Sequence, residues 1–269
     1  MERNRKLAIV IVVALALVAA LIWSTLQGSS GAGFAALDNV QVSQAFLSRL
    51  IAVPNSTFAN VGIGAAGGSI KKIATSPELT LAGKPEVLYI GAEFCPYCAA
   101  ERWAMIVALS RFGAFSNLHY MTSSATDSFA NTPSFTFYNS TYSSDYVSFV
   151  PVELTTNKEM NGTYPTLQTT NATEQQIGAS FSPNGQVSFP FIDFGNRSVL
   201  SGSTYSPQVL DGMNWTQILS QAYQTNSTIS QSVIGSANLL TAQICLATNN
   251  TPSGVCSQAY IQRIEKLFG

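Results

Sequence analysis

Two cysteines three residues apart, between a short apolar run and a helical pattern, constrain this chain more than any other feature. The run, Val87–Ala92, is β-branched and aromatic and has the length of a buried strand. Cys95-Pro96-Tyr97-Cys98 follows, and Pro96 suits the first position of a helix, where no N–H is needed. Helical spacing continues to Phe112, and a further strand is predicted at 118–122. This order predicts a right-handed crossover in a parallel sheet.

The position of the motif favours redox chemistry. At a helix start, unpaired N–H groups and the helix dipole stabilise a thiolate at Cys95. Cys98 lies one turn further on and can attack a mixed disulfide formed at Cys95. We therefore expect Cys95 to be the exposed nucleophile and Cys98 the buried resolving thiol. A zinc site is the alternative, but it lacks ligands: His119, expected to be structural, is the only histidine.

The other two cysteines, Cys245 and Cys256, bracket a polar loop at 246–255. A structural disulfide that pins two helices is the simplest interpretation, and a loop of this size contributes about 2.5–3 kcal/mol of stability. A second redox pair that relays electrons is the alternative. An even number of cysteines fits an oxidising compartment.

The N-terminus predicts export. A basic flank precedes the apolar run Leu7–Trp23, whose seventeen residues suit a membrane span better than a cleaved signal. Because positive flanks stay inside, the C-terminal bulk is expected outside, on a single-pass protein of the cell membrane. We expect a cytoplasmic tip and anchor at 1–27, a flexible tether at 28–34 and a folded domain at 35–269. A cleaved signal, the alternative, would export the same domain.

Composition agrees with an exterior location. Only 10% of residues are charged and the net charge is −1, so nothing indicates a nucleic-acid partner. Residues 212–262 carry no charged side chain. Hydroxyl and amide groups bind water at any pH, which suits an acidic exterior as well as an ordinary secreted protein. Eight Asn-x-Ser/Thr sequons are glycosylation candidates: Asn55, Asn139, Asn161, Asn171, Asn196, Asn214, Asn226 and Asn249.

The residues around the cysteine pair resemble those of the thioredoxin superfamily. Ile90–Cys98 is similar to the strand-to-active-site turn of that superfamily, and the Pro-Tyr dipeptide is the one familiar from glutaredoxins. Ser188–Asn196 resembles the loop that carries the family's cis-proline. The resemblance implies that Pro190 is cis and faces the cysteines, and that Phe189, Pro190 and Tyr97 contact an extended substrate. An ordinary strand-edge proline is the alternative for Pro190.

The resemblance covers about 87–122 and 187–219. It implies an α/β, thioredoxin-like fold with an inserted segment at about 123–186, extra N- and C-terminal helices and an N-terminal transmembrane helix. A C-terminal helical hairpin is expected at about 226–269. As a whole, the chain is similar to a family of uncharacterised archaeal membrane-anchored thioredoxin-like proteins, which implies no particular reaction.

Periodicity and turn residues predict the remaining elements. We expect an aromatic hairpin at 134–154 within the insertion. The last helix, 257–268, is expected to bury one face made of Tyr260, Ile261, Ile264, Leu267 and Phe268. The other expected elements are helices at 40–53, 173–179, 208–225 and 229–247 and two strands, at 187–194 and 198–200, joined by a turn at Gly195 and Asn196.

The chain departs from the superfamily at one position. Typical thioredoxins keep a buried acid on the strand before the motif, whereas Val87–Ile90 contains none. Glu93 is nearer and is expected to face solvent, with a role in proton transfer as the alternative. The missing acid argues against an efficient general reductase and favours an oxidant or isomerase.

The expected function is an extracytoplasmic thiol–disulfide oxidoreductase that needs no cofactor. Its expected partners are thiols or disulfides of exported proteins and an unidentified membrane redox partner that resets the cysteine pair. The alternative is a non-enzymatic binding module with the same fold. The aromatic segment 129–149 would then be its contact surface, or simply added core.

Overall fold

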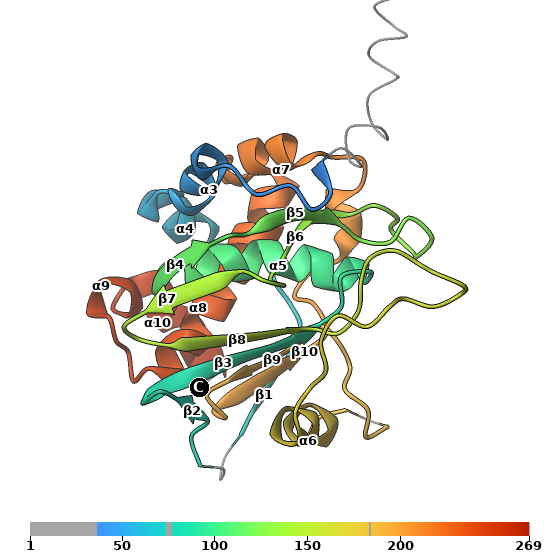
Figure 1. Cartoon of the computed structure of the whole chain (residues 1–269). Coiled ribbons are helices and arrows are strands. Elements are labelled where there is room, and N and C mark those ends of the chain that lie inside the picture. The colour runs from blue at the N-terminus through green and yellow to red at the C-terminus, as the bar shows by residue number, and fades with distance from the viewer. Residues whose placement is uncertain (1–36, 74–76, 183, 269) are drawn as a thin grey trace, which may run out of the picture. The chain divides into compact units, whose positions relative to one another are not determined.

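The computed structural model describes residues 37–73, 77–182 and 184–268 (Figure 1). The expected anchor at 1–27 and tether at 28–34 lie outside the described residues. Within the described ranges, no helix has both the length and the apolar character needed to cross a membrane. The unit that begins at Asp38 has a mixed α/β architecture, as expected at this coarse level.

A mixed sheet of six strands lies at the centre of the described unit. Its middle strand, β3 (Lys84–Gly91), is antiparallel to β9 (Phe191–Phe194) and parallel to β8 (Ser148–Glu153). From Val87 to Gly91, β3 is buried without interruption. This burial explains why its sequence is continuously apolar instead of alternating.

The sheet extends on both sides of this centre. β10 (Ser198–Ser201) forms a hairpin with β9, and β1 (Ser69–Lys72) pairs with β10, both antiparallel. As the sequence predicts, the hairpin turns at Gly195 and Asn196. Both residues have positive φ. The short β2 (Thr80–Leu81) pairs with the start of β3.

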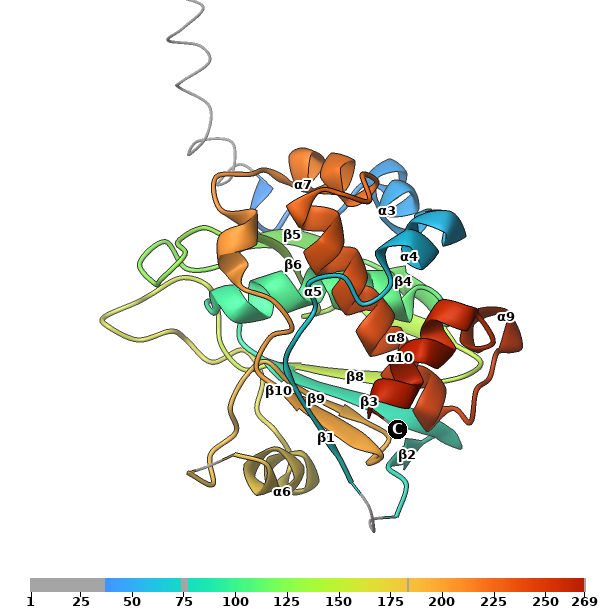
Figure 2. The same cartoon turned by 180° about the vertical axis from the view of Figure 1, so that it is seen from behind.

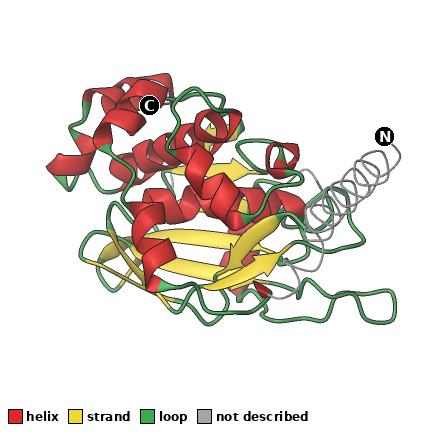
Figure 3. Cartoon of the chain, turned by 90° about the horizontal axis from the view of Figure 1, so that it is seen from above, coloured by secondary structure: helices red, strands yellow, loops and turns green. Residues whose placement is uncertain are grey.

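Helices cover both faces of the sheet, as Figures 1 and 2 show. α5 (Pro96–Leu109) and α8 (Gly235–Ala247) pack on one face, against Val87 and Ile192. α6 (Ala172–Ser180), close to the expected bounds, lies over the other face. The view from above shows the helices stacked over the strands (Figure 3).

Two small antiparallel sheets flank α5. β5 (His119–Thr122) pairs with β6 (Pro133–Thr136), and β4 (Gly113–Ser116) pairs with β7 (Thr141–Ser144). The indole N–H of Trp103, in α5, donates to the carbonyl of Pro133 at 2.8 Å. This contact fastens the β5–β6 sheet to the helix that carries the cysteines.

The prediction of the strand that pairs in parallel with β3 is wrong. The sequence predicts it at 118–122, but β5 pairs with β6, and the parallel partner is β8. β8 lies within 123–186, the segment expected to be an insertion. The expected hairpin at 134–154 is also wrong, because β6, β7 and β8 pair with three different strands. Strand signals are local, whereas pairing depends on how the intervening chain packs.

The N-terminal helix is shorter than the sequence pattern predicts. The helix expected at 40–53 is α3 (Gln44–Ile51), which begins after its cap Ser43, whose hydroxyl accepts the N–H of Phe46 at 3.2 Å. A second helix follows, α4 (Asn55–Val61).

The prediction of a single helix at 208–225 is wrong. A 3₁₀ turn, η1 (Pro207–Leu210), and α7 (Trp215–Ala222) take its place, separated at Gly212, which has a φ of 69°. Asn214 caps α7 by accepting the N–H of Gln217 at 2.9 Å.

The C-terminal helices agree better with the sequence. The π-helical turn η2 (Ser230–Ile234) leads into α8, and α9 (Ser253–Cys256) and α10 (Ala259–Phe268) follow. Tyr260, Ile261 and Ile264 are buried as expected. Leu267 is 67% exposed, so the expected core face ends before it, and the side chain of Phe268 lies outside the described part.

Candidate functional site

The cysteine pair lies between β3 and α5. β3 ends at Gly91, and Cys95 is the N-cap residue of α5, with Pro96 in its first turn. The Cys95 Sγ accepts a hydrogen bond from the backbone N–H of Cys98 at 3.4 Å. One sulfur therefore lies at the positive end of a helix, where negative charge is stabilised.

The two thiols are free and differ in acidity. A hydrogen bond from the Cys98 thiol lowers the pKa of Cys95, assisted by the Cys98 N–H and the Arg102 cation and opposed by burial. Burial raises the pKa of Cys98 well above its ordinary value. Cys95 is therefore the more readily ionised sulfur, and Cys98 retains its proton.

Cys95 is less accessible than expected. Its exposed fraction is only 6%, and Cys98 is fully buried. Phe94 and Phe189 pack against the two cysteines and cover most of the sulfur that the sequence predicts to be exposed. Tyr97, between the cysteines, is 43% exposed.

The loop before β9 lies beside the cysteines. The Phe189–Pro190 peptide bond is cis, as expected. Phe189 contacts the cysteine cluster and meets the Phe94 ring edge-on, with centroids 5.9 Å apart. The N–H of Gly202 donates to the Pro190 carbonyl at 2.8 Å, which ties this loop to the end of β10.

An aromatic rim surrounds the cysteine turn and consists of Phe94, Tyr97, Phe129, Tyr164 and Phe189. The Phe94 ring stacks on Tyr164, with centroids 4.2 Å apart and nearly parallel planes. Tyr97 meets Phe129 edge-on at 6.1 Å. Sequence reasoning missed Tyr164, which lies far along the chain in a loop with no recognisable motif.

The aromatic segment at 129–149 is only partly core. Phe135 and Phe137 are buried, and the ring centroids of Phe135 and Trp103 lie 4.7 Å apart. The other five aromatic side chains of the segment are half-buried, and Phe129 is the one that belongs to the aromatic rim. The segment therefore contributes both to the core and to the surface.

A buried ion pair adjoins the site. Arg102, on α5, donates from Nε and Nη2 to the two carboxylate oxygens of Glu153, on β8, at 2.9 and 2.7 Å. Neither side chain is exposed. Arg102 Nη2 also donates to the Ala92 carbonyl at 2.9 Å, so the pair holds the turn that precedes Cys95.

Sequence reasoning missed this pair, although two signals point to it. Arg102 follows Cys98 by four residues, which places both on one side of α5. Glu153 follows the segment 147–152, which is apolar except for Ser148, and an acid on a buried strand requires a partner. A buried acid therefore lies on the strand next to β3, and it is paired with Arg102.

Glu93 does not face solvent as expected. It is 8% exposed, and burial raises its pKa to about 7. The hydroxyl of Thr136 is its hydrogen-bond partner, and the other main influences are Glu153, Arg102 and Asp38. The two thiols are not among these influences, and a role of Glu93 in proton transfer stays a prediction.

Glu101 is a further buried acid. Its Oε2 accepts the N–H and the hydroxyl of Thr204 at 2.7 and 2.8 Å, while its Oε1 is buried without a partner. Burial raises its pKa to about 7. Glu101 thus fastens α5 to the segment after β10.

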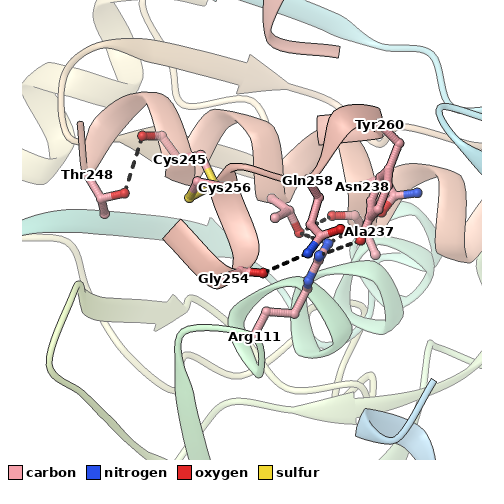
Figure 4. The surroundings of a disulfide bond; sticks show 10 residues. Arg111, Ala237, Asn238, Cys245, Thr248, Gly254, Cys256, Gln258 and Tyr260 are labelled. Carbon is pink, nitrogen blue, oxygen red and sulfur yellow. Dashed lines mark hydrogen bonds between the residues drawn. A yellow bond between two sulfur atoms is a disulfide. The ribbon is translucent and has the colours of Figure 1, made fainter. Parts of the chain in front are cut away.

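Cys245 and Cys256 form the expected disulfide, with a Cα–Cα distance of 5.5 Å. The bond joins the end of α8 to α9 (Figure 4). Nearby, the Arg111 guanidinium donates to the hydroxyl of Tyr260 at 2.8 Å and to Thr241 at 3.3 Å. Polar contacts thus hold the C-terminal helices to the turn after α5, and α8 also packs against α5 itself.

Seven of the eight sequon asparagines are exposed, and Asn196 is intermediate. Asn171 and Asn214 cap helices through their side-chain oxygens, which leaves their amide nitrogens uncommitted to the cap. The Asn196 amide nitrogen instead donates to the carbonyl of Pro77 at 2.8 Å.

His119 lies at the start of β5, with its Nδ1 3.0 Å from the carbonyl of Asn117. In the described part of the chain, no group of three or more His, Cys, Asp or Glu side chains is arranged to hold a metal ion.

Comparison with known proteins gives one partial match. A family model described as Domain of unknown function (DUF929) matches residues 72–179, which include the cysteine pair and β8. No curated protein and no solved structure matches this chain. The match is therefore to the part of the chain that carries β3, α5 and β8, and it implies no reaction.

Proposed function

We propose that this protein is a thiol–disulfide oxidoreductase that oxidises or isomerises exported proteins. The observation that carries the proposal is the asymmetry of the two free thiols at the start of α5. One has a lowered pKa and a small opening to solvent, and the other is buried with a raised pKa.

In the oxidising direction, the cycle begins with a Cys95–Cys98 disulfide. A substrate thiolate attacks the Cys95 sulfur, the Cys95–Cys98 bond breaks, and Cys98 takes up a proton. A second substrate thiolate then attacks the substrate sulfur of the mixed disulfide and releases Cys95 as a thiolate. The substrate loses two electrons and the cysteine pair gains two, which a membrane-associated disulfide or quinone oxidant must remove.

The ion pair favours this direction over general reduction. In a reductase, Cys98 must lose its proton to resolve the mixed disulfide, and a free buried carboxylate would accept it. Both oxygens of Glu153 already accept hydrogen bonds from Arg102. Leaving as a protonated thiol suits Cys98 better than attacking as a thiolate.

We further propose a thioredoxin-like arrangement for the folded unit and an exterior location. The β3–α5–β8 crossover, the β9–β10 hairpin and the cis-proline loop beside Cys95 support the fold. The apolar run Leu7–Trp23 and the exposed sequons support a single-pass anchor with the domain outside.

The test is trapping of mixed disulfides in cells. Cys98→Ala should accumulate mixed disulfides between Cys95 and substrate proteins, because Cys95 can still attack a substrate disulfide, as in isomerisation, but Cys98 is no longer present to release it. Cys95→Ala should accumulate none, and the Cys95→Ala/Cys98→Ala double variant should fail to refold reduced ribonuclease.

Two outcomes would reject the proposal. Equal trapping by both single variants contradicts the assigned roles. Full refolding activity of the double variant excludes thiol–disulfide exchange at Cys95 and Cys98. The second candidate, a non-enzymatic binding module, would then remain, and the aromatic rim is the one observation that favours it.

A further inference from the structure

A pocket of about 340 Å³ is lined in part by Glu93, which lies two residues before Cys95 in the sequence. The proposed thiol chemistry does not use this pocket. β5 contributes Tyr120 and Met121 to its wall, and the loop at 156–167 contributes Leu167. Sites for small organic ligands have this volume and are mostly apolar, with a few polar groups that orient the ligand.

Glu93 is the buried acid of this pocket. Its carboxyl has the Thr136 hydroxyl as a partner, and no described Lys, Arg or His side chain forms an ion pair with it. A carboxyl among apolar walls is costly to ionise unless a cation is brought to it. Its hydrogen-bonding capacity exceeds what the hydroxyl supplies.

The second acid of the pocket, Asp38, already has partners. Its carboxylate accepts the Asn157 amide at 3.0 Å and the Lys158 ammonium at 3.1 Å. The Lys158 side chain is 74% exposed, and Lys158 also lines the pocket. Glu93 is therefore the carboxyl available to a ligand.

We propose that this pocket binds a small organic cation, a primary amine on an aromatic or aliphatic stem. The ammonium group pairs with Glu93, and the stem packs on Tyr120, Met121 and Leu167. Tyr120 and Tyr138 also line the pocket, and aromatic rings are a favourable environment for a cation. This site is independent of the redox proposal, because none of its lining residues is a cysteine.

The pH dependence follows from the charges around Glu93. The other carboxyl groups that act on Glu93 are Glu153, which is paired with Arg102, and Asp38, which is paired with Lys158. The Glu93 carboxyl, with a pKa of about 7, is neutral in acid and ionised above that value. Amine binding should therefore strengthen as the pH rises through 7 and should release a proton from Glu93 near that pH.

Calorimetric titration of the full chain in detergent tests this, with 2-phenylethylamine as the cationic probe and 2-phenylethanol as its neutral match. At about pH 8, the wild type should bind the amine about tenfold or more tighter than the alcohol, and at about pH 5.5 this preference should vanish. Glu93→Gln should show no preference at either pH. Glu78→Gln, which removes an exposed carboxylate outside the pocket, should behave as the wild type.

The Lys158→Ala variant provides a second test. The Lys158 side chain is exposed, so its removal should not disturb the core. This variant should bind the amine a few-fold more tightly, since it loses a cation that repels the ligand. A wild type that binds both probes equally, or a Glu93→Gln variant that keeps the pH-dependent preference for the amine, overturns the proposal. So does weaker amine binding by Lys158→Ala.

Discussion

Arg102 and Glu153 form a two-point ion pair, with both side chains fully buried, between the helix that carries the cysteines and the strand parallel to β3. The same guanidinium donates to the carbonyl of Ala92 and lowers the pKa of Cys95. One side chain therefore links the position of the cysteine turn to the acidity of its nucleophile.

Removing the cation should affect stability and reactivity separately. Arg102→Met leaves Glu153 buried with the Phe137 N–H as a donor but without its counter-charge, which should cost about 3–5 kcal/mol of unfolding free energy. Arg102→Met/Glu153→Met should recover most of that loss. In both variants the pKa of Cys95 should rise, because the nearby positive charge is gone. Urea unfolding and the pH dependence of Cys95 alkylation measure the two effects, and a double variant as unstable as the single one would contradict this account.

The C-terminal disulfide should be structural. Cys245→Ser should lower the unfolding temperature by about 5–10 °C under oxidising conditions, because the unfolded chain regains the freedom of the closed loop. Alkylation of Cys95 and ribonuclease refolding should be unchanged when measured below the transition. Loss of activity in a variant that remains folded would show that Cys245 and Cys256 relay electrons.

Glu101 should make the protein more stable in acid. Its pKa is about 7 in the folded state and near 4.5 when unfolded, so the folded state holds one more proton between these values. Stability from this group is complete below about pH 4.5 and is lost as the pH rises to about 7. Glu101→Gln keeps an acceptor for Thr204 but does not titrate. The difference in urea midpoint between wild type and this variant should therefore fall as the pH rises, and a constant difference would refute the shift.

Asn196 should be the least glycosylated sequon. Asn196 is half-buried and its amide nitrogen donates to the Pro77 carbonyl, whereas Asn55 is exposed. Glycopeptide mass spectrometry on protein from its native host should find occupancy at the exposed sites and little at Asn196. Protease added to intact cells should also reach the domain. Full protection from protease would contradict the exterior location on which this prediction depends.

Features that depend on neighbouring residues could be predicted from the sequence. β3, the start of α5 at Cys95 and the β9–β10 hairpin follow from local apolar runs, a proline at a helix start and a Gly-Asn turn. The disulfide followed from the count and spacing of the cysteines, and the cis bond at Pro190 from a resemblance to a known loop.

Features that depend on distant residues could not be predicted from the sequence. The strand signal at 148–153 does not reveal that β8 pairs with β3, because β5 carries an equally good signal and is nearer in the chain. Glu153 and the buried position of Glu93 were missed for the same reason, since both depend on what β8 and the loop after it place around β3. Exposure of Cys95 was overestimated because Phe189, about ninety residues away, covers it.

The parallel pairing of β3 with β8 also sets the order in which the site can form. As the chain emerges N-terminus first, Cys95 and Cys98 are made well before Glu153 and Phe189. Until those residues arrive, the two thiols have neither the buried counter-ion of Arg102 nor their aromatic cover. The nascent chain therefore presents an ordinary pair of accessible cysteines, and its distinct nucleophile exists only once the sheet is complete.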